Sequence, residues 1–148
     1  MCSIRTAESV CAGHPDKLAD QIADQILDDI LYDDKAARVA VEVMAAGRRI
    51  IVTGEITTNH RPRIRESVRT ALARAGYSPL GILIYVWTRR QSSDINAGVT
   101  TSLEARGGDS SAFALQGAGD QGTVYGYATA ETPERLPLPL VLARRICE

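Results

Sequence analysis

A short run near the N-terminus, Gly13-His14-Pro15-Asp16-Lys17, places an imidazole, a carboxylate and an ammonium side by side. Pro15 suits the first turn of a helix, so these side chains are expected beside backbone N–H groups that lack partners. Such a set suits a phosphate together with a divalent metal. A plainer interpretation stays open, in which His14 caps the helix and Asp16 and Lys17 are surface charges.

Two glutamates are the next candidates. Glu42 and Glu55 each stand in a run of apolar or β-branched residues that alternates as a strand does. A carboxylate on a half-buried sheet face needs a cation or hydrogen-bond donors, so each glutamate is a candidate to bind a cation or an ammonium. Solvent-exposed sheet faces also carry glutamates, and from the sequence alone that interpretation is favoured.

A third candidate is the glycine-rich stretch from Gly117 to Gly122, which offers a free backbone and one carboxylate, Asp120. It lacks the Gly-Lys-Ser/Thr ending of a Walker A loop. It also lacks the glycine spacing and the preceding strand of a dinucleotide fold. By itself the stretch is weak support for nucleotide binding.

The elements that must position these residues follow from hydrophobic periodicity. Three- and four-residue steps predict helices, alternation predicts strands, and Gly47 suits the turn of a hairpin. The expected elements are a helix over 18–31, strands over 39–44 and 50–57, a helix from Pro62 that ends at Gly76, and a strand over 80–87. This last strand is apolar on both faces and is expected in the sheet interior.

The order helix, strand, strand, helix, strand predicts an α+β fold with helices packed on a mixed or antiparallel sheet. Residues 1–88 are expected to form one sub-domain, 89–122 a glycine-rich loop region, and 123–148 the start of a second sub-domain. In that last part Tyr125 and Tyr127 alternate as in a strand, and Pro139 opens an amphipathic helix with no stop signal before Glu148.

Composition narrows the function classes. The chain has 148 residues, 45% of them hydrophobic, with 17 basic against 18 acidic side chains, so no strong field draws it to nucleic acid or to a membrane surface. Without a signal peptide or an apolar span, a cytoplasmic location is expected. Cys2, Cys11 and Cys147 form no C-x-x-C pair and are expected to be reduced thiols.

Taken in order, these stretches resemble the methionine adenosyltransferases, also called S-adenosylmethionine synthetases. The similarity runs through the whole chain and rests on several short motifs in the family's order. The matching stretches are Glu8-Ser9-Val10, 13–17 continuing into 19–22, Gly54-Glu55-Ile56-Thr57-Thr58, Gln91-Ser92, Ser93-Asp94-Ile95, Gly98-Val99, 117–122 and 126–129.

In that family the sulfur of methionine attacks C5′ of ATP and displaces triphosphate, which the same site hydrolyses to pyrophosphate and phosphate. The resemblance implies that His14 is catalytic and contacts the triphosphate, and that Lys17 and Asp120 also bind ATP. It implies Mg²⁺ and K⁺ as cofactors, with Asp16 a ligand of Mg²⁺ and Glu42 a ligand of K⁺. ATP and L-methionine are the implied small-molecule partners.

The resemblance also assigns the methionine site and a gate. Glu55 would accept the methionine ammonium, and Gln91 would contact the same amino acid. A gating loop would be formed by Gln91, Ser92, Ser93, Asp94, Ile95, Asn96, Ala97 and Gly98. The family usually has proline in place of Ser93 and Ala-Gln in place of Asn96-Ala97, so a looser or shifted loop is expected.

Relatives in this family are more than twice as long, and their later part supplies further lysines, an arginine and aspartates around the triphosphate. Their fold has three similar sub-domains, and their sites form between two subunits. The resemblance therefore implies that this chain holds part of the site, with uncovered hydrophobic faces, and belongs to a homodimer or homotetramer when intact. The alternative is a truncated, non-catalytic relative that serves as a partner subunit or nucleotide-binding module.

Overall fold

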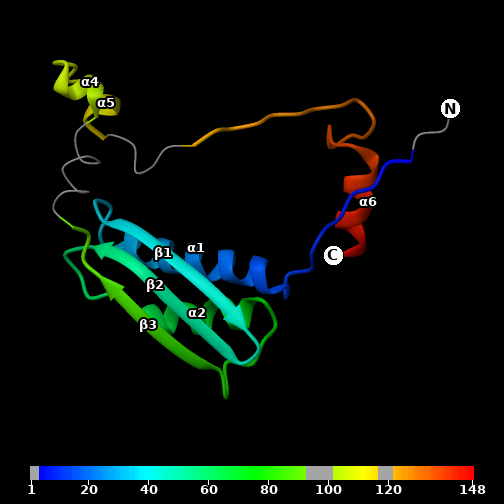
Figure 1. Cartoon of the computed structure of the whole chain (residues 1–148), viewed down its shortest axis with the longest axis horizontal. Coiled ribbons are helices and arrows are strands. Elements are labelled where there is room, and N and C mark those ends of the chain that lie inside the picture. The colour runs from blue at the N-terminus through cyan, green and yellow to red at the C-terminus, as the bar shows by residue number, and fades with distance from the viewer. Residues whose placement is uncertain (1–3, 93–101, 117–121) are drawn as a thin grey trace.

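The computed structural model describes residues 4–92, 102–116 and 122–148. Within these described ranges, two longer helices and three strands come first along the chain, and three shorter helices follow (Figure 1). Their bounds are α1 Pro15–Asp33, β1 Arg38–Ala46, β2 Arg49–Thr57, α2 Ile64–Arg74, β3 Leu83–Arg89, α4 Leu103–Arg106, α5 Ala112–Gln116 and α6 Leu138–Ile146.

Helix α1 buries one stripe and exposes another, as its periodicity predicts. Leu18, Ile22, Ile26 and Ile30 recur at four-residue steps and are buried. The opposite stripe carries Asp20, Asp24 and Asp28, which are exposed to solvent, so their mutual repulsion is screened by water.

Strands β1 and β2 form an antiparallel hairpin in which Ala46 pairs with Arg49. The two-residue turn places Gly47 at φ 57, a left-handed conformation that glycine adopts without steric cost. Arg48 follows, and its guanidinium donates hydrogen bonds to the backbone carbonyls of Leu80 (3.0 Å) and Gly81 (3.1 Å). The hairpin turn therefore fixes the segment that enters β3.

Helix α2 connects β2 to the parallel strand β3, giving a sheet of order β1-β2-β3. Gly76, at φ 84, ends the helix as predicted, and the Tyr77 N–H donates to the Leu72 carbonyl at 2.9 Å. Among the residues that the structure describes, β3 is an edge strand of the sheet, so the expectation of an interior strand is wrong. Its exposure alternates along the chain, because only one face of β3 packs against helices.

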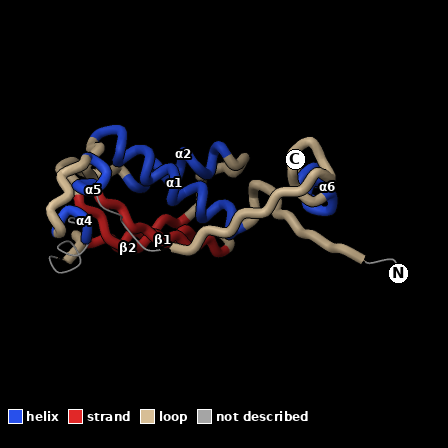
Figure 2. The backbone as a smooth tube through the Cα atoms, turned by 90° about the horizontal axis from the view of Figure 1, so that it is seen from above, coloured by secondary structure: helices blue, strands red, loops and turns tan. Residues whose placement is uncertain are grey.

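Helices α1 and α2 both lie on one face of the sheet (Figure 2). Helix α1 packs mainly against β1 and α2, and the fully buried side chains of this layer include Ile22, Ile26, Val52 and Val68. The β1, β2 and β3 side chains that pack against this core are Val39, Val41, Val43, Ala45, Ile50, Ile56, Ile84 and Val86. The predicted α+β class, with helices packed on a mixed sheet, is confirmed.

The other face of the sheet carries large apolar side chains that are open to solvent. Met44, Leu83, Tyr85 and Trp87 are exposed, Trp87 to 63% of its surface. The rings of Tyr85 and Trp87 stack with their centroids 5.8 Å apart. Exposed apolar side chains gathered on one face are typical of a surface that another polypeptide covers.

After β3 the structure differs from the sequence predictions in two places. Helices α4 and α5 interrupt the region expected to be a loop, and Tyr125 and Tyr127 lie in exposed chain without strand structure. The predicted final helix is confirmed as α6, and it ends at Ile146 with Cys147 as its C-cap.

The N-terminal segment runs beside α6 (Figure 1). Arg5 pairs with Glu131 at 2.8 Å, and the other carboxylate oxygen of Glu131 accepts from the Leu138 N–H at the start of α6 (3.1 Å). The Leu138 N–H, and then the Arg5 guanidinium, hold the pKa of Glu131 below its usual value.

Among the described residues, no helix has the length and apolar character that a bilayer span requires.

Candidate functional site

The start of α1 is built by His14, which is the helix N-cap. Its Nδ1 accepts a hydrogen bond from the Asp16 backbone N–H at 3.2 Å, so the capping interpretation is correct as a structural role. A neutral imidazole whose Nδ1 is an acceptor carries its proton on Nε2. The cap therefore leaves an N–H donor available for a second task.

Asp16 and Lys17 follow His14 in the first turn of α1. The Asp16 side chain is 93% exposed, and its carboxylate lies 4.0 Å from His14 Nδ1. Lys17 Nζ donates to the Val10 carbonyl at 3.3 Å, which ties the N-terminal segment to the helix. An imidazole N–H, an ammonium and a helix N-terminus lie together with one carboxylate, a set that can bind a polyphosphate with its cation.

Tyr77, which follows α2, contacts the segment that leads into α1. Its hydroxyl donates to the Gly13 carbonyl at 2.9 Å. A Cβ atom on Gly13 would lie 2.6 Å from the same hydroxyl, so a larger residue there would displace the tyrosine. The position of His14 therefore depends on a contact with the far end of α2.

The two predicted metal ligands differ in how well they fit their ions. Mg²⁺ commonly binds one or two carboxylates and completes its shell with water and substrate phosphates, so the exposed Asp16 fits that role. Glu42 is exposed on β1 opposite Thr53, whose hydroxyl donates to the Trp87 carbonyl at 3.2 Å. Over the described ranges, no three His, Cys, Asp or Glu residues form a metal cluster. One carboxylate does not define a K⁺ site.

Glu55 is positioned on β2 by the glycine before it. Gly54 has φ 125, and a Cβ atom there would clash with the carbonyl of Ala40 on β1. Glycine therefore allows the two strands to approach closely at this point. The Glu55 side chain, 16% exposed, pairs through Oε1 with Arg89 Nε at 3.0 Å.

Gln91 also has an arginine partner. Arg38 Nε, at the start of β1, donates to Gln91 Oε1 at 3.0 Å, so the amide NH₂ of Gln91 points away from that arginine. Both residues that the resemblance assigns to methionine are thus held by arginines. The Arg89 side chain is 81% exposed, and ion pairs to exposed side chains contribute only about 0–1 kcal/mol, so a ligand cation can compete for Glu55.

Glu55 and Gln91 line one cavity of about 260 Å³ at the end of the sheet where β1 begins. One side of the cavity is apolar, because Leu27 and Leu31 of α1 face it together with Ala37 and Val39. The other side carries Arg38, Glu55 and Gln91. An apolar wall beside a cation, an anion and an amide can hold a zwitterion with an apolar side chain.

The structure keeps the two groups of candidate residues apart. Asp16 lies at the first turn of α1, whereas Leu31, beside the Glu55 cavity, lies at its last turn (Figure 1). Leu31 stands fifteen positions after Asp16 in the helix, a rise of about 22 Å along its axis. In one copy of this chain, His14 and the Glu55 cavity therefore lie at opposite ends of α1. Of the other predicted residues, Asp120 and Ser93 to Gly98 lie outside the described ranges.

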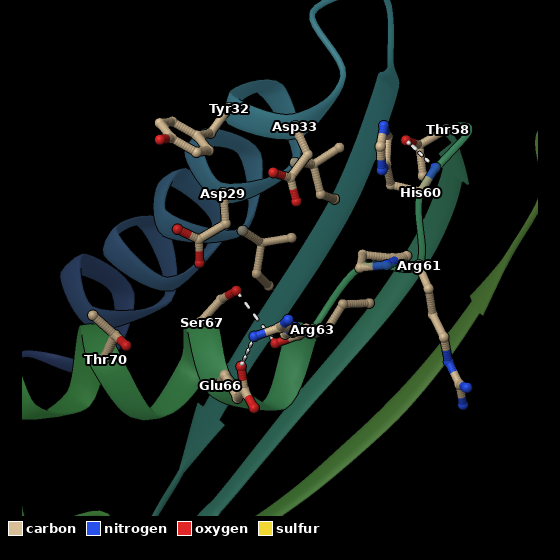
Figure 3. Close-up of a pocket in the computed structure, with 14 residues that line it drawn as sticks. Asp29, Tyr32, Asp33, Thr58, His60, Arg61, Arg63, Glu66, Ser67 and Thr70 are labelled. Carbon is tan, nitrogen blue, oxygen red and sulfur yellow. Dashed lines mark hydrogen bonds and ion pairs between the residues drawn. The ribbon is translucent and has the colours of Figure 1, made fainter.

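A further cavity, of about 370 Å³, was not predicted from the sequence (Figure 3). It lies between the last turns of α1 and the first turns of α2, where Asp29 and Asp33 face Arg63 and Glu66. Arg63 and Glu66 already pair with each other at 3.5 Å. Contacts between α1 and α2 that form only on folding create this cavity, so local sequence patterns do not reveal it.

Cys11, three residues before His14, has a neighbour that the sequence did not predict. A hydrogen bond with the Cys147 thiol, and the charge of that thiol, raise the pKa of Cys11 above its usual value. The Cys147 thiol also donates to the Ser9 carbonyl at 3.5 Å. Both cysteines are free thiols, as expected, although their side chains lie together.

Comparison with known proteins first defines the class of protein. Residues 3–96 match the model of the "S-adenosylmethionine synthetase, N-terminal domain", and residues 115–148 match that of the central domain of the same enzymes. The α+β layer described above therefore corresponds to the N-terminal domain of that family. The chain belongs to the S-adenosylmethionine synthetase family.

Individual relatives agree with this assignment. The chain is 45% identical to the S-adenosylmethionine synthase of Nocardia farcinica and 48% identical to that of Kosmotoga olearia, over 95% of its own length in both cases. It spans only 37% and 38% of those relatives. An S-adenosylmethionine synthetase structure from Campylobacter jejuni superposes with a TM-score of 0.73 at 31% identity, over 97% of this chain and 35% of that one.

Proposed function

We propose that this chain contributes two part-sites to a methionine adenosyltransferase, which forms S-adenosylmethionine from ATP and L-methionine. The observation that carries the proposal is the cavity shared by Glu55 and Gln91, residues 36 positions apart, beside the apolar wall of α1. Glu55 accepts the methionine ammonium, Gln91 orients the amino acid, and the leucines receive the thioether side chain. A thioether sulfur attacks without losing a proton, so no general base is needed.

At the other end of α1, the proposed ligand is the triphosphate of ATP. His14 Nε2–H donates to the oxygen on which negative charge develops as triphosphate leaves C5′. Lys17 and Asp120 belong to the same proposed ATP site. Mg²⁺ held by Asp16 would neutralise phosphate charge, and K⁺ remains an expected activator with Glu42 as one proposed ligand.

Because the two part-sites lie about 22 Å apart along α1, each needs its complement from another chain or segment. A second subunit that presents its Glu55 cavity to the His14 end would complete one site, and the homodimer or homotetramer is proposed for that reason. The proposed boundaries are 1–88, 89–122 as the gate and connection, and 123–148 as the start of the next sub-domain. Hydrolysis of the triphosphate in the same site is part of this proposal.

The competing proposal is a non-catalytic relative that serves as a partner subunit or nucleotide-binding module. Isothermal titration with ATP·Mg²⁺, run beside an assay for S-adenosylmethionine, tests both. We expect weak binding and no turnover by the chain alone, with affinity lowered about tenfold in His14→Ala and Asp16→Asn, since each loses a charge-assisted contact. Asp20→Asn, in the exposed stripe of α1, is the matched control. Equal ATP affinity in all four proteins would contradict the ATP site.

A further inference from the structure

We infer that Arg38 binds the α-carboxylate of the amino acid and so selects zwitterions over simple amines. The inference rests on the proposed function, because it takes Glu55 as the site of the ammonium. It concerns a residue for which the family resemblance suggested no role. The geometry that carries it is the polar lining of the 260 Å³ cavity. This lining consists of Arg38 at the start of β1, Glu55 on β2 and Gln91 just after β3.

An α-amino acid presents opposite charges on two groups bonded to one carbon. A site for it needs an anion and a cation close together, with room for the side chain. Glu55 supplies the anion of this cavity and Arg38 its cation, while Leu27 and Leu31 supply the apolar wall. Arg89 is less suited to the role, because it is not among the residues that line this cavity and its side chain is 81% exposed.

The hydrogen bond of Arg38 leaves the required donors. Its Nε donates to Gln91 Oε1 at 3.0 Å, which fixes the plane of the guanidinium. The terminal nitrogens carry four more N–H donors in a fixed fork, the geometry that binds a carboxylate through two parallel hydrogen bonds. The same bond turns the Gln91 amide NH₂ outward, where it donates to the ligand.

A titration followed by NMR with two ligands tests the inference. L-Methionine carries the carboxylate, and 3-(methylthio)propylamine is the same molecule without it. The wild-type chain is expected to bind methionine about tenfold more tightly than the amine, since a charge-assisted pair is lost. Arg38→Gln should abolish that preference by weakening methionine alone, and Arg38→Lys should restore part of it.

The outcomes separate the inference from the proposed function. If Arg38→Gln weakens both ligands by the same factor, Arg38 acts only through Gln91 and the inference is wrong. A second outcome is that methionine binds and Glu55→Gln weakens its binding, but the wild type binds methionine and the amine equally well. In that case the methionine site is supported and the role of Arg38 is wrong. If methionine gives no shifts up to its solubility, the proposed methionine site itself fails. The ligand comparison in the wild type requires no variant to fold.

Discussion

Asp34 links the end of α1 to the segment after β2 through its carboxylate. It follows α1, and its Oδ2 accepts from the Asn59 N–H at 2.9 Å and from the Thr58 hydroxyl at 2.8 Å, beyond the end of β2. The Asn59 N–H and then the Thr58 hydroxyl lower the pKa of Asp34. The charged carboxylate therefore holds the end of the Gly54–Thr58 motif against α1.

A lowered pKa in the folded state makes this contribution dependent on pH. The stabilisation is present above the unfolded pKa of about 3.9 and is lost as the pH falls through the lower folded value. Asp34→Asn should therefore reduce the free energy of unfolding at pH 7, and its deficit against the wild type should shrink below about pH 4. Urea titrations at pH 7, 4 and 3 measure this, with Asp20→Asn as the control. A deficit that does not change with pH would contradict the account.

The helices and strands could be predicted where their hydrophobic patterns depend only on residues close together in the chain. The stripe of α1 and the alternation around Gly47 depend on neighbours in the chain, so α1, β1 and β2 were placed within a few residues. Strand β3 was assigned to the interior because both of its faces are apolar. Its outward residues Tyr85 and Trp87 are apolar although they are exposed to solvent.

This exposed sheet face gives a prediction at the scale of the element. We expect the chain to self-associate through it, because a second copy would bury the stacked rings of Tyr85 and Trp87. Trp87→Glu should weaken self-association by about tenfold or more, since burying an unpaired carboxylate is unfavourable. Sedimentation velocity over a range of concentrations measures it. Tyr32→Glu, at an 89% exposed position on α1, is the control, and an equal effect of both changes would exclude this face.

Only part of the site could be predicted from the sequence, because only some of its residues are neighbours in the chain. His14, Asp16 and Lys17 stand together in the chain, so their common position at a helix start could be predicted. The arginine partners of Glu55 and Gln91 could not, since those pairs join residues 34 and 53 positions apart. Which side chains meet across a sheet depends on strand register, and one residue of slip turns each of them to the other face.

At the scale of the whole molecule, α1 holds two part-sites at its opposite ends. The central claim is that ATP·Mg²⁺ and methionine bind one copy of this chain in different places. Backbone amide shifts measured by NMR, with each ligand in turn, test it most directly. We predict that ATP·Mg²⁺ shifts the amides of Gly13, His14, Asp16 and Lys17 and leaves those of Glu55 and Gln91 unchanged, and that methionine does the reverse. Shifts by both ligands at one common end of α1 would contradict the account.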